Sequence, residues 1–194
     1  GCVEVWVGAE SGSQKILDAM DKGITVEQIV TARARLKAAG IKVGFFLQFG
    51  YPSESFQDIL ATVRMVRDTL PDTIGVSVSY PLPGTKFYRM VEDQLGSKSN
   101  WVDSNDLAMM FEGTYQSPFY RRLHRLLHAD LELRQRLAAL PASPDVAART
   151  ALNRLDEEWA ELARTEAQYR SAAPTPIPNA TPMPAAPDLS REWN

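Results

Sequence analysis

The sequence contains a single cysteine, Cys2, among its 194 residues. One thiol excludes an internal disulfide, and it also excludes an iron-sulfur cluster or a cysteine-rich zinc site whose ligands all come from this chain. A protein with so little cysteine is typical of a reducing compartment. We therefore predict a cytoplasmic location.

The sequence also lacks long apolar runs and a charge excess of either sign. No segment approaches the roughly 20 apolar residues that a membrane-spanning helix needs. Lys and Arg number 21 against 24 Asp and Glu, which leaves a net charge of -3. We expect no transmembrane segment and no nucleic acid partner. Because the chain opens on Gly1 inside a predicted strand, without an initiator methionine, we expect the front of a longer protein to be missing.

Proline is concentrated at the end of the chain. The segment "APTPIPNATPMPAAPDLSREWN" is too rich in proline and too poor in large apolar residues to join a core. The composition predicts three regions, an α/β unit over 1–95, a helical extension over 96–170 and a disordered tail over 171–194.

Strand, turn and helix succeed one another three times in the first region. Each predicted strand is a short apolar or alternating segment, and a turn rich in Gly, Ser or Pro separates it from the next helical segment. The predicted strands are 3–8, 41–50 and 73–80. Helices of several turns between strands favour right-handed βαβ crossovers, so the sequence predicts a parallel sheet.

Local signals mark where the helices begin and end. Thr25 and Gln28 form a capping-box pattern at the start of one helix, and Gly40 lies just beyond its end. Pro71 ends the helix that begins at Phe56.

Three loops lie after the carboxyl ends of the predicted strands, with the sequences "AESGS", "QFGYPSES" and "PLPGT". In a parallel sheet they meet at one edge, where α/β proteins bind ligands. Glu10 can accept hydrogen bonds from hydroxyl or ammonium groups, Ser11 adds a hydroxyl, and Gly12 allows a ligand to approach the backbone. A polyol or amino acid group suits this loop better than a phosphate, which Glu10 would repel. The alternative is that these are turn and cap residues without a ligand.

Longer segments of the chain resemble a known family. The segments "GAESGSQKILDAMDKGITVEQI", "GIKVGFFLQFGYPSES" and "VSVSYPLPGTKFY" resemble the second half of radical S-adenosylmethionine enzymes, most closely the group with an N-terminal cobalamin-binding domain. "NWVDSNDL" and "FEGTYQSPFYRRLH" resemble the trailing part of that group, so the resemblance covers about 1–128. It implies an α/β fold in which 1–95 is a partial (βα) barrel, the last three of six βα units.

The resemblance also implies cofactors and a reaction. In the family a CxxxCxxC loop binds a 4Fe-4S cluster that chelates S-adenosylmethionine, and a 5′-deoxyadenosyl radical then acts on a small-molecule substrate. The cluster loop is absent from this sequence, so its ligands would come from a missing N-terminal half of the barrel. Cobalamin is a further implied cofactor. The expected function is the C-terminal portion of such an enzyme, for methyl transfer or rearrangement, with this chain inactive alone. The alternative is a non-enzymatic α/β interaction module that has lost the cluster-binding half.

The resemblance assigns cofactor-binding positions but no catalytic residue. Lys22 matches a basic position that approaches the methionine carboxylate, although a solvated lysine is the alternative. Ser53 stands where the family usually has glycine, which predicts mild strain if φ is positive there. Pro83 belongs to a turn that would close the rim, or to a type II turn without a ligand. The full set of predicted cofactor-binding residues is Glu10, Ser11, Gly12, Lys22, Gln48, Gly50, Pro52 and Pro83.

Two patterns in the helical region have structural explanations. His124 and His128 have the spacing of a metal-binding pair, but the leucines between them favour packing, and we expect no metal site. The helix predicted over 146–170 carries a seam that includes Leu155, Trp159 and Leu162. That seam either folds back onto the chain or forms a homodimer.

Overall fold

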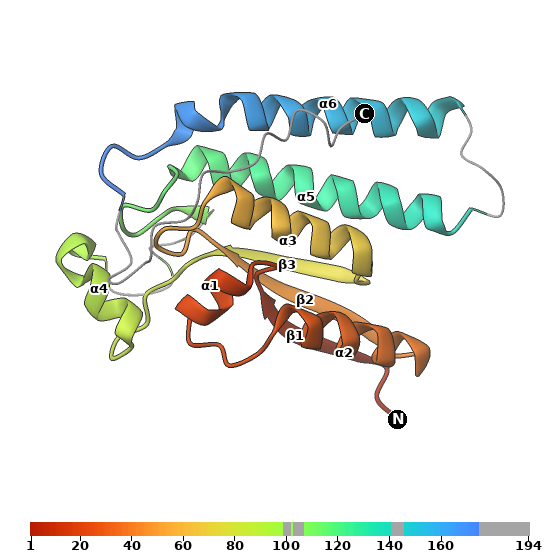
Figure 1. The fold of residues 1–194 in the computed structure, drawn as a ribbon, viewed down its shortest axis with the longest axis horizontal. Coiled ribbons are helices and arrows are strands. Elements are labelled where there is room, and N and C mark those ends of the chain that lie inside the picture. The colour runs from red at the N-terminus through yellow and green to blue at the C-terminus, as the bar shows by residue number, and fades with distance from the viewer. Residues whose placement is uncertain (99–101, 103–106, 141–145, 175–194) are drawn as a thin grey trace.

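The N-terminal part of the fold is a small parallel sheet with helices packed on it, seen in a computed structural model that describes residues 1–98, 102, 107–140 and 146–174 (Figure 1). The strands are β1 (Glu4–Glu10), β2 (Lys42–Phe49) and β3 (Thr73–Val78). All pairs are parallel and the order is β1-β2-β3. The predicted parallel sheet is therefore confirmed.

Three helices connect these strands: α1 (Gln14–Ala19), α2 (Val26–Ala38) and α3 (Phe56–Thr69). Alternate strand residues are buried toward them, which is the pattern expected for a sheet face that packs against helices. The buried strand residues on this side are Ala9, Val43, Phe45, Leu47, Phe49, Ile74 and Val78. They join side chains of α3 in the main core.

The other face of the sheet is open in the described part of the chain. Trp6 on β1 and Phe46 on β2 leave 43% and 51% of their surface exposed there. The three strands form an open sheet, and the predicted partial barrel is not confirmed. A sheet with helices on one face only is nevertheless the arrangement that a segment of a (βα) barrel would have.

Helix ends agree closely with their predicted signals. Thr25 caps α2, with the Gln28 side chain accepting in return, and Gly40 has a φ of 72° just after the helix. A second capping box, which the sequence prediction missed, joins Ser55 and Asp58 at the start of α3. Leu70 ends α3 in a left-handed conformation, directly before Pro71.

Four further elements form the rest of the described chain. They are α4 (Lys86–Leu95), α5 (Ser117–Ala138), α6 (Val146–Thr165) and the 3-10 helix η2 (Glu166–Tyr169). Figure 1 shows α5 and α6 lying side by side, with α5 also against α3. The predicted seam residues Leu155, Trp159 and Leu162 are buried in this packing. The seam thus folds back on its own chain, and a homodimer through the terminal helix stays a prediction.

One core runs through most of the molecule, from the sheet through α3 and α5 to α6. A smaller cluster joins Val91 and Leu95 of α4 to Met110 and Phe111. In the described residues no helix combines the length and the apolar character needed to cross a membrane. Most of the "NWVDSNDL" segment and nearly all of the predicted disordered tail, from residue 175 onward, lie outside the described residues.

Candidate cofactor-binding rim

The three predicted loops meet at one edge of the sheet. The Tyr51 hydroxyl, in the loop after β2, donates to the Ala19 carbonyl at the end of α1 at 2.9 Å. The Tyr51 ring lies 5.0 Å from that of Phe87 in α4. Lys86 pairs with Asp21 at 3.3 Å. These contacts between the segments that adjoin the three loops confirm that the loops share one rim.

Glu10 and Lys22 form an ion pair at this rim. Lys22 Nζ lies 2.7 Å from Glu10 Oε1, and the two side chains are 35% exposed for Lys22 and 19% exposed for Glu10. The pairing of β1 with β2 shifts between Gly8 and Glu10, and Glu10 has a φ of 57°. A Cβ at Gly8 would lie 2.9 Å from Glu10 Oε1 and 3.1 Å from Lys22 Nζ. The absence of a side chain at Gly8 therefore makes room for the pair.

The next residues turn inward, toward α3. Ser11 is fully buried, with its hydroxyl 3.2 Å from that of Thr62. The Gly12 amide donates to the same Thr62 oxygen at 2.8 Å. A Cβ at Gly12 would lie only 2.4 Å from the Ala61 carbonyl oxygen. Close packing against α3 thus explains why glycine is required here, and the ligand contacts expected of Ser11 and Gly12 stay predictions.

Asp58 ties the first loop to α3, a role that the sequence prediction did not identify. Its carboxylate accepts from the Ser13 hydroxyl at 2.7 Å and pairs with Lys15 at 2.5 Å. Burial alone would raise the pKa of Asp58, but hydrogen bonds from Lys15, Ser55 and Ser13 outweigh it and hold that pKa below its ordinary value. The only signal in the sequence was a Ser55-to-Asp58 capping spacing.

The second loop turns sharply after β2. Gly50 has a φ of 80° and packs tightly, because a Cβ there would lie 3.0 Å from Met109 Sδ and 3.1 Å from Tyr120 Cζ. Ser53 has a φ of 61°, which is the geometry for which mild strain is expected at this position. Pro52 is buried, whereas Gln48 is half-buried on the open face of the sheet.

Glu54 holds this second loop from inside. Its side chain is buried, and Oε2 accepts from the Gly50 amide at 2.6 Å. Burial raises the pKa of Glu54 to about 8, against the opposing effect of the Gly50 hydrogen bond. The carboxyl group therefore keeps its proton at neutral pH. Nothing in the sequence pattern indicated that this glutamate would be buried.

The third loop is a tight turn. The Thr85 amide donates to the Leu82 carbonyl at 3.1 Å, and Gly84 has a φ of 85°. Proline before a positive-φ glycine is the pattern of a type II turn. Pro83 is exposed, and Thr85 caps α4 by accepting from the Tyr88 amide at 3.1 Å. The turn itself is confirmed, and contact between Pro83 and a cofactor stays a prediction.

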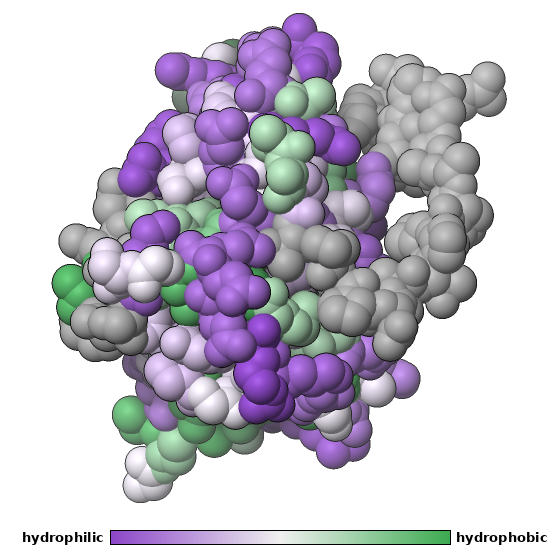
Figure 2. Space-filling model, turned by 90° about the vertical axis from the view of Figure 1, so that its left-hand side faces the viewer, coloured by the Kyte–Doolittle hydropathy of each residue, from purple (hydrophilic) through white to green (hydrophobic). Residues whose placement is uncertain are grey.

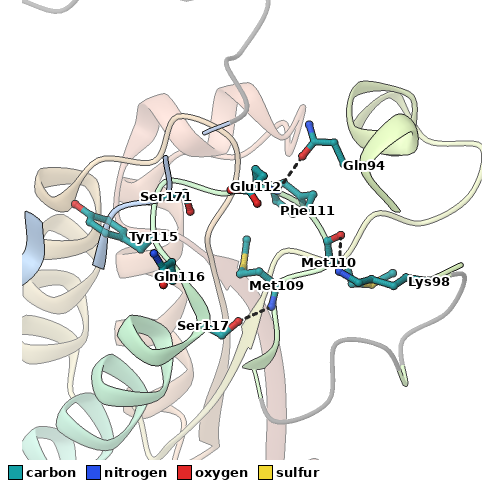
Figure 3. A pocket seen from close by; sticks show the side chains of 10 residues that line it. All are labelled: Gln94, Lys98, Met109, Met110, Phe111, Glu112, Tyr115, Gln116, Ser117 and Ser171. Atoms are coloured by element: carbon teal, nitrogen blue, oxygen red, sulfur yellow. Dashed lines mark hydrogen bonds between the residues drawn. The ribbon is translucent and has the colours of Figure 1, made fainter. Parts of the chain in front are cut away.

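A separate pocket of about 230 Å³ lies between the end of α4 and the start of α5 (Figure 3). Met109 lines it, and the Met109 amide donates to the Ser117 hydroxyl at 3.0 Å. Met109 also fills the space beside Gly50, so its side chain separates this pocket from the second loop.

Figure 2 shows one face of the molecule with mainly hydrophilic side chains and hydrophobic atoms in separate patches.

The described residues offer no group of three or more His, Cys, Asp or Glu side chains that could hold a metal ion. The His124 and His128 rings lie 4.1 Å apart, and His128 Nδ1 is 2.8 Å from the His124 carbonyl. Cys2 is exposed. The described residues therefore do not fit an iron-sulfur cluster, and contact of Glu10 and Lys22 with a cofactor stays a prediction.

Comparison with known proteins gives partial matches. No family model matches the chain. A protein named as a putative methylthiotransferase from Methanocaldococcus jannaschii is 35% identical over 58% of this chain and 24% of its own length. An uncharacterized methyltransferase of Pyrococcus horikoshii is 31% identical over 52% of this chain and 22% of its own length.

A further match is tRNA-2-methylthio-N(6)-dimethylallyladenosine synthase of Geotalea uraniireducens, 35% identical over 44% of this chain and 20% of its own length. The chain spans about a quarter or less of the relatives that it matches. Over that part of its length, the chain is a homologue of proteins named as methylthiotransferases and methylthio-adenosine synthases.

Proposed function

We propose that this chain is the C-terminal portion of a radical S-adenosylmethionine enzyme of the methylthiotransferase kind and that it supplies part of the S-adenosylmethionine site. The observation that carries the proposal is the Glu10–Lys22 ion pair, at 2.7 Å on the rim where three loops converge. The names of the homologous proteins support the same class of enzyme.

The ion pair matches the charges of an amino acid. Lys22 would bind the carboxylate of the methionine portion, and Glu10 would bind its ammonium group. Both side chains are partly exposed and already face each other. Lys22 can therefore exchange the Glu10 carboxylate for the carboxylate of the ligand, and Glu10 can exchange the Lys22 ammonium for the ammonium group of the ligand. The exchange leaves no charge unpaired at the rim.

The remaining residues would position the cofactor. The buried Glu54 fixes the Gly50 amide, and Tyr51 ties this loop to the end of α1. Gln48 faces the open side of the sheet, where its amide could contact a bound nucleoside. When bound, the cofactors would supply the radical chemistry, while this chain binds and orients them.

Cobalamin dependence and the choice between methyl transfer, methylthio transfer and rearrangement rest on resemblance alone. Two of the three relatives reported above have methylthio names and one is named a methyltransferase, so the names favour methylthio transfer by two to one. We therefore place the parent protein nearer to methylthiotransferases than to cobalamin-dependent enzymes, and binding of cobalamin to the full-length parent tests this choice directly.

A second candidate is a non-enzymatic interaction module. It is favoured by the open sheet face and by the unpaired outer edges of β1 and β3 within the described residues. Such a module would form a defined complex in light scattering and would bind no S-adenosylmethionine.

The experiment is S-adenosylmethionine binding by isothermal titration to the full-length parent protein, prepared without oxygen. We expect Lys22→Ala and Glu10→Ala each to weaken binding about tenfold or more, because each removes a charge-assisted hydrogen bond. Lys86→Ala is the matched control, since Lys86 pairs with Asp21 on the same rim but with both side chains largely exposed. Unchanged affinity in both rim variants would rule out the proposed site.

A further inference from the structure

Helix α4 is held in place by a small core of its own. Val91 and Leu95 of α4 are buried against Met110 and Phe111, and among the described residues this cluster shares no buried side chain with the main core. Figure 1 shows α4 apart from the stacked helices α3, α5 and α6. A helix held by so few buried apolar side chains has a lower local stability than the main core. It can therefore open while the rest of the chain stays folded.

Glycines with positive φ lie at both ends of α4. Gly84 has a φ of 85° shortly before the helix begins, and Gly96 has a φ of 58° directly after Leu95. A Cβ on either glycine would meet nothing within 4 Å among the described residues, so close packing does not hold the backbone at these positions. Glycine can absorb a large change in φ and ψ, and hinges are often small residues at the end of an element. The two glycines thus supply a hinge on each side of α4.

The first turn of α4 contacts the part of the rim that presents Lys22. The Phe87 ring lies 5.0 Å from the Tyr51 ring, at an interplanar angle of 40°. The Tyr51 hydroxyl donates to the Ala19 carbonyl at the end of α1. Asp21 follows with a φ of 53°, and Lys22 is the next residue. The position of Lys22 therefore depends on Phe87, through Tyr51 and the end of α1.

Two contacts of different strength join α4 to this part of the rim. Lys86 and Asp21 form an ion pair at 3.3 Å, but their side chains are 71% and 73% exposed. Ion pairs this exposed stabilise a structure only weakly. Tyr51, in contrast, is only 5% exposed, so its contact with Phe87 buries aromatic surface. The aromatic contact is therefore the main attachment of α4 to the rim.

The other end of α4 is packed less tightly. The pocket of about 230 Å³ lies there, lined by Gln94 of α4 and by Ser117 of α5 (Figure 3). Two hydrogen bonds to the backbone cross this end, from the Glu112 amide to Gln94 Oε1 at 2.8 Å and from Lys98 Nζ to the Met110 carbonyl at 3.3 Å. Water can replace such bonds at little cost where the groups are accessible to it. This end therefore offers little resistance to movement of α4.

We propose that α4 is a hinged lid on the rim, which swings about Gly84 and Gly96 and which, when closed, fixes the end of α1 that presents Lys22. The closed form is the one seen in the structure, with Phe87 against Tyr51. A ligand bound at Lys22 would favour the closed form, because the fixed end of α1 binds it better than one released by an open lid. This coupling to a ligand rests on the proposed function, whereas the opening of α4 does not.

Hydrogen exchange of the full-length parent protein, measured by mass spectrometry, tests the lid. We expect the amides of α4 to exchange about tenfold faster or more than those of α5, because the lid opens without the main core. Phe87→Ala should speed exchange in α4 and in residues 17–22 by about tenfold and leave α5 unchanged. Lys86→Ala removes only the exposed ion pair and is the matched control, so it should change these rates by less than about threefold.

A glycine substitution tests the hinge. Gly84→Ala should speed exchange in α4 by about tenfold, because alanine disfavours the φ of 85° that the closed form requires. Gly40→Ala is the matched control, since Gly40 also has a positive φ, 72°, with nothing within 4 Å of its Cβ position among the described residues, but it lies after α2. It should leave exchange in α4 unchanged. Unchanged exchange in Gly84→Ala would overturn the hinge.

The outcomes separate the lid from the proposed function. S-adenosylmethionine should slow exchange in α4 and in residues 17–22 of the wild type, but not in Lys22→Ala. If the parent protein binds no S-adenosylmethionine, the proposed function fails, while faster exchange in α4 than in α5 still supports the lid. Equal exchange in α4 and α5 overturns the lid, as does a Phe87→Ala variant in which α5 changes by the same factor as α4. Binding of S-adenosylmethionine without slower exchange in α4 overturns the coupling.

Discussion

At the scale of single residues, Glu54 is the least ordinary side chain at the rim. It is an acid with 1% of its surface exposed, and its Oε1 atom has no hydrogen-bond partner among the described residues. Tyr120 is buried nearby, and burial is the main reason that the pKa of its hydroxyl is raised, with the Glu54 charge as the next cause. A protonated Glu54 avoids an uncompensated charge in this apolar surrounding.

We predict that Glu54 makes stability depend on pH. Its pKa is about 8 in the folded protein and near 4.5 when exposed. Between these values the folded state holds a proton that the unfolded state has lost, so the free energy of unfolding decreases as pH rises from about 4.5 to about 8. Glu54→Gln should make this decrease in the free energy of unfolding smaller. The reduction should be roughly 1.4 kcal/mol for each unit by which the pKa of Glu54 differs between the folded and unfolded states.

Urea denaturation at pH 5 and pH 8 measures this effect. Glu54→Gln should be less sensitive to the change of pH than the wild type. Glu27→Gln, at an exposed position in the first turn of α2, should keep the wild-type dependence. A Glu54→Gln variant with the full wild-type pH dependence would contradict the prediction.

Residues at the rim differ in how far the sequence could predict them. The resemblance, which places glycine at position 53, indicated strain there if φ were positive, and the φ of Ser53 is 61°. Glu10 beside Lys22 required the bulge in β1, which no local pattern indicates. The inward orientation of Ser11 and Gly12 depends on how closely α3 approaches, and that distance is set by packing between segments about 50 residues apart.

At the scale of elements, one buried carboxylate joins the helical region to the α/β unit. Asp130 on α5 is fully buried and accepts two hydrogen bonds from Arg67 on α3, at 2.8 and 2.9 Å. Arg134 donates to it at 3.0 Å. The Arg67 guanidinium also lies 5.7 Å from the centre of the Trp159 ring on α6. Helices α3, α5 and α6 therefore meet around the Arg67 guanidinium.

We predict that Asp130→Ala lowers the free energy of unfolding by about 3–5 kcal/mol, because it leaves the partly buried Arg67 without its main partner. Glu158→Ala, which breaks the exposed Arg154–Glu158 contact at 3.7 Å on α6, should change it by less than about 1 kcal/mol. Chemical denaturation of both variants gives the comparison. Similar small changes would show that the Asp130 contacts add little to stability.

Helices and strands were predicted well where periodicity is strong. The three strands and the capping box at Thr25 agree with apolar spacing and residue types. The choice between a folded-back and a dimeric α6 could not be made from the seam, because the same spacing serves both kinds of packing. Trp159 is buried and α6 packs against α5 within the single chain, whereas pairing of two chains through α6 stays a prediction.

At the scale of the whole molecule, the α/β unit and the helical extension share one core. Phe45 and Leu47 of β2 belong to the same cluster as Leu123 and Leu127 of α5 and Trp159 of α6. A core shared in this way favours unfolding as a single cooperative unit.

We therefore predict that amide protons in β2 and α5 exchange with the same opening free energy under native-state hydrogen exchange. Asp130→Ala should lower both by an equal amount, since loss of the α3–α5 contact would destabilise the whole unit. Protection that falls in α5 while β2 keeps its wild-type value would show two independent domains.

The fit of Trp6 over Gly44 also restricts the paths along which the sequence can change. Any side chain at position 44 would collide with the indole, since even a Cβ would lie 2.6 Å from it. Loss of the indole must therefore precede the gain of a side chain at position 44, whereas the reverse order passes through a strained intermediate. The two positions should behave as an epistatic pair, and glycine at position 44 is expected wherever a relative keeps tryptophan at position 6.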